Sequence, residues 1–191
     1  LLKRGAKVDA KNSIGSTALM SAAHQGHVQV AETLLQHGAE INLQSSRDCT
    51  ALMFAADQGH ERVVDLLLRH GAEVDLQHGD GYTALTRAAF HGRPVVVLQL
   101  LRAGADMALR TANGHTALQF AKEKGHTECV AAVKTFLGEV AAARRDAAVV
   151  EAGGAGAGGD AASGKGAAAA PIAASSSGGV ESGTGEDAVP E

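Results

Sequence analysis

The sequence predicts an all-α protein, a solenoid of stacked helix-turn-helix units followed by a disordered C-terminal tail. The motif Thr-Ala-Leu recurs at residues 17, 50, 83 and 116, so the chain repeats every 33 residues. Aromatic residues make up 3% of the chain and Trp is absent, so a buried interior has to use the small and aliphatic side chains that suit closely packed helices. From residue 151 onward most positions are Gly, Ala or Ser without hydrophobic periodicity, which is typical of a disordered segment.

Each repeat is expected to form two short antiparallel helices and an extended loop. In the first complete unit, Thr17 caps the first helix, and Gly26 supplies the backbone freedom with which the chain reverses. Gly38 then takes the left-handed position after the second helix. The apolar residues spaced for one buried stripe on that second helix are Val28, Val30, Leu34 and Leu35.

The constant register also predicts the boundaries of the repeats. Residues 1–13 are expected to be the end of a truncated repeat, because Leu1, Leu2 and Gly5 fit the frame of a second helix and its end. The expected complete repeats are 14–46, 47–79 and 80–112, followed by a C-terminal capping repeat at 113–150 and the disordered tail at 151–191.

The last repeat departs from the others in a direction that predicts a cap. Lys122 replaces an Ala, Lys134 replaces a Leu, and Leu137 replaces the Gly that ends the earlier units. Lysines on the face that a fifth unit would cover fit a polar terminal repeat. Without its terminal Gly, the last helix is expected to continue to about Val150. A coincidental decay of the repeat is the alternative.

A single unit is not expected to fold alone. Ordering about 33 residues at roughly 1.5 kcal/mol each costs about 50 kcal/mol. At about 25 cal/mol per Å² this requires the burial of roughly 2,000 Å² of apolar surface. A pair of short helices reaches that area only when neighbouring units cover both of its flanks, so stability is expected to come from stacking.

These motifs resemble the ankyrin repeat family. The segments GSTALMSAAHQGH, GYTALTRAAFHGR and ALMFAADQGHERVVDLLLRHGAEVD match most of the family pattern G-x-T-P-L-H-x-A-A-x-x-G-H, followed by V-V-x-x-L-L and G-A-D. The resemblance covers residues 1 to about 140 and implies an ankyrin-repeat solenoid.

At the place of the family's first His, this chain has Met20, Met53, Thr86 and Gln119. We therefore expect the hydrogen bond commonly made there to be lost. Asp48 stands where other units have Gly, so it is expected to adopt a positive φ.

Charge and composition argue against several classes of partner. The net charge is −4, and residues 1–150 carry 16 basic and 15 acidic side chains without a basic cluster, so nucleic acid is not an expected ligand. No stretch has the roughly 18 apolar residues needed to cross a bilayer, so no membrane insertion is expected. Cys49 and Cys129 are isolated, which favours a reducing, intracellular location in the cytoplasm or nucleus.

Three short motifs suggest metal or nucleotide chemistry, and each has a simpler explanation. His24 and His27 are close in sequence, but only His27 recurs in other units, as His60 and His126, and the resemblance implies a structural hydrogen-bonding role for it. The His126-x-x-Cys129 pair is explained by a core cysteine in frame with valines. GDAASGKG at 159–166 lacks the Ser or Thr of a phosphate loop and the strand before it. We expect no metal, no cofactor and no catalytic residue.

The expected function is that of a protein-protein interaction scaffold, a monomeric array that binds another protein through its concave face. The resemblance implies that loop tips and first helices form this surface. The variable residues at those positions are Ile14, Ser16, His24, Gln25, Arg47, Cys49, Asp57, Gln58, Asp80, Tyr82, Phe90, His91, Asn113, His115, Glu123 and Lys124. Two alternatives stay open. The first is that these positions are unconstrained surface, and the second is that the array is a regulatory or substrate-recruiting module of a larger enzyme or channel.

Tyr82 and Phe90 are the expected anchors of that surface. Tyr82 is the only Tyr in the chain, and both residues fall in the third unit, one just before its first helix and one near the end of that helix. Aromatic side chains at the centre of an interface typically contribute much of its energy. The alternative is that Phe90 packs against the next unit.

Overall fold

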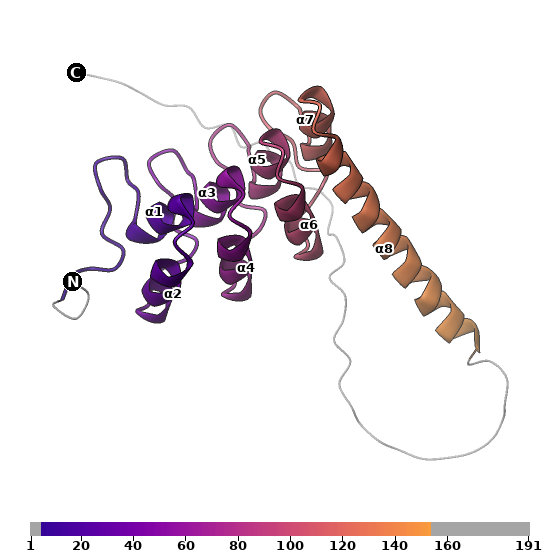
Figure 1. Cartoon of the computed structure of the whole chain (residues 1–191), viewed down its shortest axis with the longest axis horizontal. Coiled ribbons are helices and arrows are strands. Elements are labelled where there is room, and N and C mark those ends of the chain that lie inside the picture. Colours follow the sequence, from indigo (N-terminus) through magenta and orange to yellow (C-terminus); the bar gives the residue numbers. More distant parts are fainter. Residues whose placement is uncertain (1–4, 154–191) are drawn as a thin grey trace, which may run out of the picture. The chain divides into compact units, whose positions relative to one another are not determined.

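The computed structural model confirms the predicted all-α architecture. It describes the backbone of residues 5–153 and the side chains of residues 5–145, and within these residues it contains eight α-helices and no strand (Figure 1). The first helices of the four units are α1 (Ala18–Gln25), α3 (Ala51–Gln58), α5 (Ala84–Phe90) and α7 (Ala117–Glu123). The second helices are α2 (Val28–Gln36), α4 (Glu61–Arg69), α6 (Pro94–Arg102) and α8 (Thr127–Gly153).

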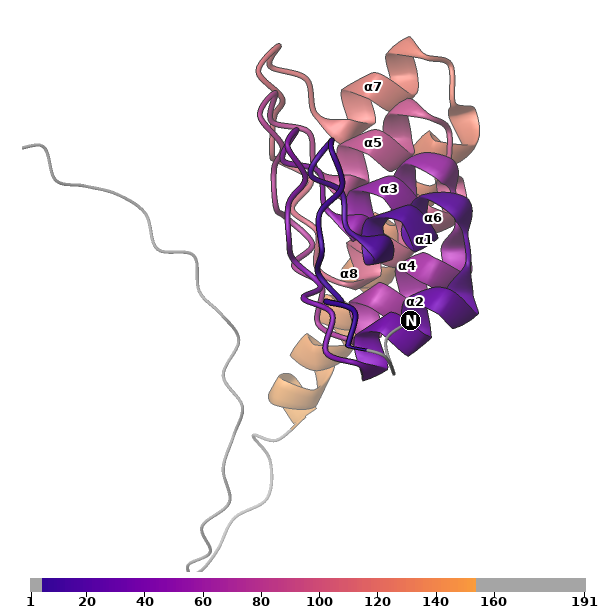
Figure 2. The same cartoon turned by 90° about the vertical axis from the view of Figure 1, so that its left-hand side faces the viewer.

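The helices stack in two rows that follow the chain. Each first helix packs against the next first helix, and each second helix packs beside the next second helix. The loops that precede the first helices lie side by side along one edge of the stack (Figure 2). Four helix pairs are therefore joined by the same contacts between successive units, as the constant register predicts.

The last helix is longer than the other second helices. As expected, it does not end at Leu137, and it continues past Val150 to Gly153. Lys122, Lys134 and Leu137 are exposed. Residues 154–191, which hold most of the predicted disordered tail, and residues 1–4 lie outside the described residues. The boundaries of the individual repeats stay a prediction.

The first helices begin at threonine caps. The side chain of Thr17 accepts a hydrogen bond from the N–H of Met20, and the other three units repeat this geometry. At the other end, Gly26 is left-handed with φ 73°, as predicted for the chain reversal. Asp48 is the only non-Gly residue with positive φ among the described residues, at 57°, which confirms the expectation for this position.

The expected loss of a hydrogen bond next to these caps is wrong for most of the array. In the third unit, Thr86 Oγ1 accepts from the N–H of Thr83 at 2.7 Å. In the fourth, Gln119 Oε1 accepts from the N–H of Thr116 at 2.8 Å. Met20 Sδ makes a weaker contact of this kind at 3.4 Å. Any acceptor in the third helical position can reach back to the N–H of the capping residue, so the bond does not require His.

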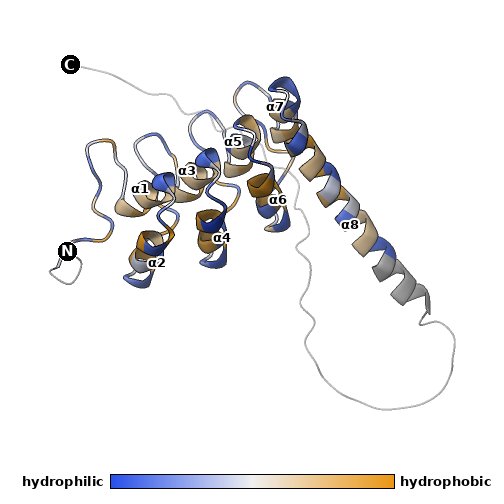
Figure 3. Cartoon of the chain, viewed as in Figure 1, coloured by the Kyte–Doolittle hydropathy of each residue, from blue (hydrophilic) through white to orange (hydrophobic). Residues whose placement is uncertain are grey.

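The core consists of buried aliphatic side chains from both rows of helices. Figure 3 shows hydrophobic positions on the helices of both rows. The buried stripe expected on α2 is confirmed only in part: Leu34 is buried, Val28 and Leu35 are partly buried, and Val30 is 50% exposed. The counterparts of Val30 in the other units, Val63, Val96 and Cys129, are buried. The reason is the position of α2, which is flanked by another second helix on one side only within the described residues.

A polar contact repeats between successive units. His60 Nε2 donates to the carbonyl oxygen of His24 at 3.0 Å, and His126 Nε2 donates to that of Phe90 at 3.0 Å. In the third unit Arg93 takes the place of His, and its Nε donates to the carbonyl of Asp57 at 3.2 Å. Each side chain satisfies a carbonyl at the end of the preceding first helix, which has no partner within its own helix. The structural role predicted for this histidine position is confirmed at 60 and 126.

The glycine before each second helix makes room for this contact. A Cβ on Gly92 would lie 2.7 Å from the His126 ring, and one on Gly26 would meet His60 in the same way. Gly125 has the same left-handed backbone but no atom within 4 Å of such a Cβ. These glycines therefore serve both the backbone turn and the approach of the next unit.

Replacing Leu67 with Ala tests the assignment of the core. Leu67 is fully buried, so Leu67→Ala is expected to lower the free energy of unfolding by about 2 to 5 kcal/mol. Leu137→Ala removes the same atoms from a side chain that is 47% exposed, and it should cost clearly less. Urea denaturation measures both. A loss below about 1 kcal/mol for Leu67→Ala would contradict the assignment.

Alanine at two equivalent glycines separates backbone strain from the contact between units. Gly125→Ala is expected to cost about 1 to 2 kcal/mol, because it places a side chain in the left-handed region. Gly92→Ala should cost more, since it also displaces the His126 ring from the Phe90 carbonyl. Urea denaturation of both variants, alone and combined with His126→Ala, measures this coupling. Equal costs at the two glycines would show that the contact adds nothing to stability.

Candidate functional site

The candidate site is the first-helix surface, which we define as α1, α3, α5 and α7 together with the turns that precede them. These turns span residues 12–16, 45–49, 78–82 and 111–115. Each turn is closed by the same backbone hydrogen bond, for example from the N–H of Ser45 to the carbonyl of Cys49 at 3.0 Å. The repeat thus places equivalent positions of all four units in one row.

Hydrogen bonds join neighbouring turns into a continuous edge. The N–H of Ala112 donates to the carbonyl of Asp80 at 2.8 Å, and the N–H of Ser46 donates to that of Ile14 at 3.3 Å. Between the second and third of these turns the bridge is a side chain, since Gln44 Nε2 donates to the carbonyl of Gln77 at 3.3 Å, and Gln77 Nε2 donates in turn to the carbonyl of Arg110 at 3.2 Å. Side chains that project from these turns are therefore held on a connected backbone.

The predicted surface residues differ in how much side chain they present. Exposed residues are Ile14, His24, Gln25, Arg47, Asp80, His91, Asn113, Glu123 and Lys124. Partly exposed residues are Asp57, Gln58, Tyr82, Phe90 and His115. Ser16 and Cys49 are buried, because the side chain before each capping Thr turns toward the helices when it is small. These two residues offer little surface to a partner.

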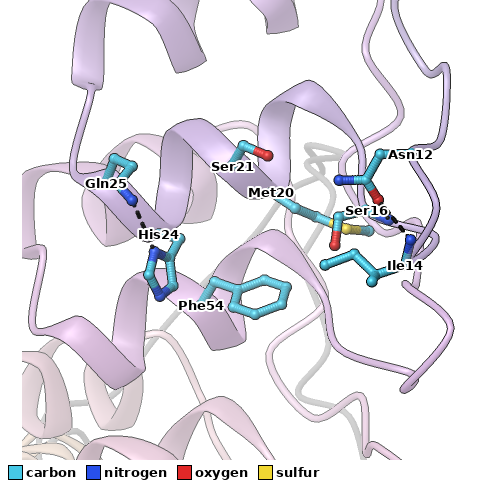
Figure 4. Close-up of a pocket in the computed structure, with 8 residues that line it drawn as sticks. All are labelled: Asn12, Ile14, Ser16, Met20, Ser21, His24, Gln25 and Phe54. Atoms are coloured by element: carbon cyan, nitrogen blue, oxygen red, sulfur yellow. Dashed lines mark hydrogen bonds between the residues drawn. The ribbon is translucent and has the colours of Figure 1, made fainter.

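A pocket at the first unit brings several predicted residues together (Figure 4). It has a volume of about 270 Å³ and lies between the first turn, α1 and α3. Its lining consists of Asn12, Ile14, Ser16, Met20, Ser21, His24, Gln25 and Phe54. Ile14 is 65% exposed at the rim, and the His24 ring meets the Phe54 ring edge-on at 5.9 Å between centroids. This pocket combines apolar lining residues, Ile14, Met20 and Phe54, with polar ones.

Aromatic side chains of the third and fourth units form a cluster on the same surface. Tyr82 stacks on Phe120 with 5.5 Å between ring centroids, and Phe90 meets both rings edge-on, at 6.4 Å and 5.4 Å. His115 stacks on the other side of Phe120 at 5.1 Å. Lys124 Nζ lies 4.6 Å from the centroid of the Phe90 ring, a cation-π distance. Phe90 therefore packs against the next unit, yet it stays partly exposed.

A charged network lies beside this cluster. Asp57 Oδ1 is 3.1 Å from Arg87 Nη1 and 2.9 Å from His91 Nδ1, and the Asp57 side chain is 16% exposed. Arg87 Nη2 lies 3.6 Å from the Cys49 sulfur. Burial raises the pKa of the Cys49 thiol, so at neutral pH this sulfur is a weak neutral acceptor. The Asp57 carboxylate thus accepts from Arg87 and lies close to His91, whose Nδ1 is also 3.2 Å from the carbonyl oxygen of Arg87.

Sequence analysis missed one helical position of this surface. The residues there are Ser21, Phe54, Arg87 and Phe120, and all four line a pocket or form the aromatic cluster. The signal was present, because this position varies between units. It also lies three residues before the predicted position of His24, and residues three apart share a helix face.

The residues considered for metal or nucleotide chemistry do not assemble on this surface. His60 and His126 contact carbonyl oxygens, and burial raises the pKa of Cys129 to about 11, with Glu128 adding to the shift. The core position predicted for Cys129 is confirmed. Within residues 5–145, no three His, Cys, Asp or Glu side chains are placed to hold a metal ion. The segment 159–166 lies outside the described residues.

Comparisons with known proteins bear on the repeat. A family model described as ankyrin repeats (3 copies) matches residues 1–78, 38–110 and 66–136. A search of curated protein sequences gave no match. In the part of the chain that the structure describes, no helix has the length and apolar character needed to span a membrane.

Proposed function

Because the chain belongs to the ankyrin repeat family, we propose that it is a scaffold that binds a partner protein through the first-helix surface. Ankyrin repeats are generally protein-protein interaction modules and are typically non-catalytic. The proposal for this chain goes further, because it assigns the binding to one surface and to particular residues on it.

The observation that carries the proposal is the separation of repeated and variable residues. Residues that recur every 33 positions, such as Leu19, Leu52 and Leu85, are buried in the core. Residues that vary between units project from the turns and first helices, where they lie in register along one connected edge. A surface with a constant framework and variable side chains is suited to recognising one particular partner.

The chemistry of these variable residues supports the same surface. Ile14 is a large exposed apolar side chain, and Tyr82 and Phe90 are partly exposed aromatic rings. Aromatic residues are enriched among the side chains that dominate binding energy. Two pockets, lined by Phe54 in one case and by Phe90 in the other, offer places for partner side chains. We therefore retain Tyr82 and Phe90 as proposed anchors and add Phe54.

Substitutions on the two sides of the stack test this proposal. Short random peptides displayed on phage are selected on the full chain, and the affinity of the selected peptides is measured for variants. Ile14→Ala and Phe90→Ala are expected to weaken binding at least about tenfold, because each truncates a side chain of the surface. Val95→Ala removes an exposed apolar side chain from α6 and should leave binding unchanged.

Thermal melting of each variant accompanies the affinity measurement. Ile14 is mostly exposed, so the melting temperature of Ile14→Ala should stay close to that of the parent chain. If Val95→Ala weakened binding while Ile14→Ala and Phe90→Ala did not, the partner would use the second helices and the proposal would fail.

A further inference from the structure

One pocket of the first-helix surface has a composition unlike the rest. It is lined by His78, Tyr82, Arg87, Phe90 and His91, and its volume is about 190 Å³. Small-molecule and cofactor sites usually occupy about 300 to 1,000 Å³, so this pocket is smaller than such sites. Its size suits a single side chain presented by another protein.

Arg87 distinguishes this pocket from its equivalents in the other units. The same position holds Ser21, Phe54 and Phe120 elsewhere, so only the third unit carries a cation there. A guanidinium has five N–H donors. Two contacts are made by Arg87, to Asp57 Oδ1 and to the Cys49 sulfur, and its Nε is buried without an acceptor in the described part of the chain. Arg87 therefore retains donor capacity.

The charge inside the pocket is positive. None of its five lining side chains is acidic, and the nearby Asp57 carboxylate accepts from Arg87 Nη1 and lies 2.9 Å from His91 Nδ1. Lys124 adds a further cation over the Phe90 ring. The adjoining pocket shares Arg87 and His78 but differs in charge, because Asp48 and Asp80 also line it beside Arg47. The preference for an anion therefore belongs to the pocket beside Phe90 and not to the whole surface.

The walls of the pocket are aromatic. The Tyr82 ring lies 5.3 Å from the His78 ring and 6.4 Å from the Phe90 ring, measured between centroids. Such walls suit the methylene stem of an acidic side chain and an apolar neighbour beside it, while the cations contact the carboxylate.

We propose that this pocket binds a Glu or Asp side chain that the partner presents next to an apolar residue. The proposal rests on the proposed function, since it names the chemistry of the segment that the first-helix surface recognises. The carboxylate accepts from the Nη N–H groups of Arg87 that Asp57 and Cys49 do not use, and charge-assisted pairs of this kind are stronger than neutral hydrogen bonds.

Peptides selected from a random library on the full chain provide the probe. They are expected to be enriched in an acidic residue beside an apolar one. Exchanging that Glu for Gln in a synthetic copy of a selected peptide should lower the affinity at least about tenfold, as expected for a lost hydrogen bond to a charged group. Loss of less than about threefold would overturn the proposal.

Arg87→Met gives the sharpest variant, because it removes the cation and exposes the charge of Asp57. The variant should lose its preference for Glu over Gln, and a Lys copy of the same peptide should bind it better than the Glu copy. Arg62→Met is the matched control, since it removes an equal charge from an exposed position on α4 and should keep the Glu preference. A Glu preference that survives Arg87→Met would contradict the proposal.

His91→Gln provides a second variant that should fold normally, because the His91 side chain is 42% exposed. It should weaken binding of the Glu peptide several-fold and leave binding of the Gln copy little changed, because the imidazole lies in the lining of the pocket. Equal losses for the Glu and Gln peptides would contradict the part assigned to His91.

The outcomes also separate this inference from the proposed function. Selected peptides without acidic residues that still lose binding with Ile14→Ala and Phe90→Ala would overturn the acidic chemistry alone. Peptides insensitive to every substitution on the first-helix surface would overturn both.

Discussion

Each unit of this array depends on the next unit to cover its apolar side and to satisfy a carbonyl at the end of its first helix. His60, Arg93 and His126 reach back across successive boundaries and donate to main-chain oxygens of the preceding unit. The glycines at 26, 59 and 92 allow that approach, because a Cβ there would collide with the incoming side chain. The stability of the array is then a sum of the contributions from contacts between neighbouring units. A shift in the register of 33 residues would break all of these contacts.

The same constraint creates the first-helix surface that we propose for binding. Packing between neighbours fixes the repeated residues, so only positions that point away from the stack are free to vary. Since each unit is placed on the last by the same contacts, those positions line up in the turns and along the first helices. The third unit combines a cation with aromatic side chains, because Arg87, paired with Asp57, lies beside the partly exposed rings of Tyr82 and Phe90.

Most of the fold could be predicted from the sequence, because local signals and the repeat agree. Each of three features could be predicted from one residue: the caps from Thr17 and its equivalents, the chain reversal from Gly26, and the extension of the last helix from Leu137 in place of a Gly. The exposure of Val30 could not be read from its apolar spacing, since burial depends on what lies beside a helix. The pairing of Arg87 with Asp57 joins residues 30 positions apart in two units, and only the stacking geometry brings these side chains together. Cys49 is predicted as a surface residue from its variability, yet its side chain is buried.

Hydrogen–deuterium exchange of the full chain, alone and saturated with a selected peptide, tests the central claim most directly, because it requires no substitution. The account predicts that bound peptide slows exchange in the turns at 78–82 and 111–115 and in α5 and α7. Exchange in α2, α4 and α6 should change little. Protection confined to these second helices, with α5 and its turn unaffected, would contradict the assignment of binding to the first-helix surface.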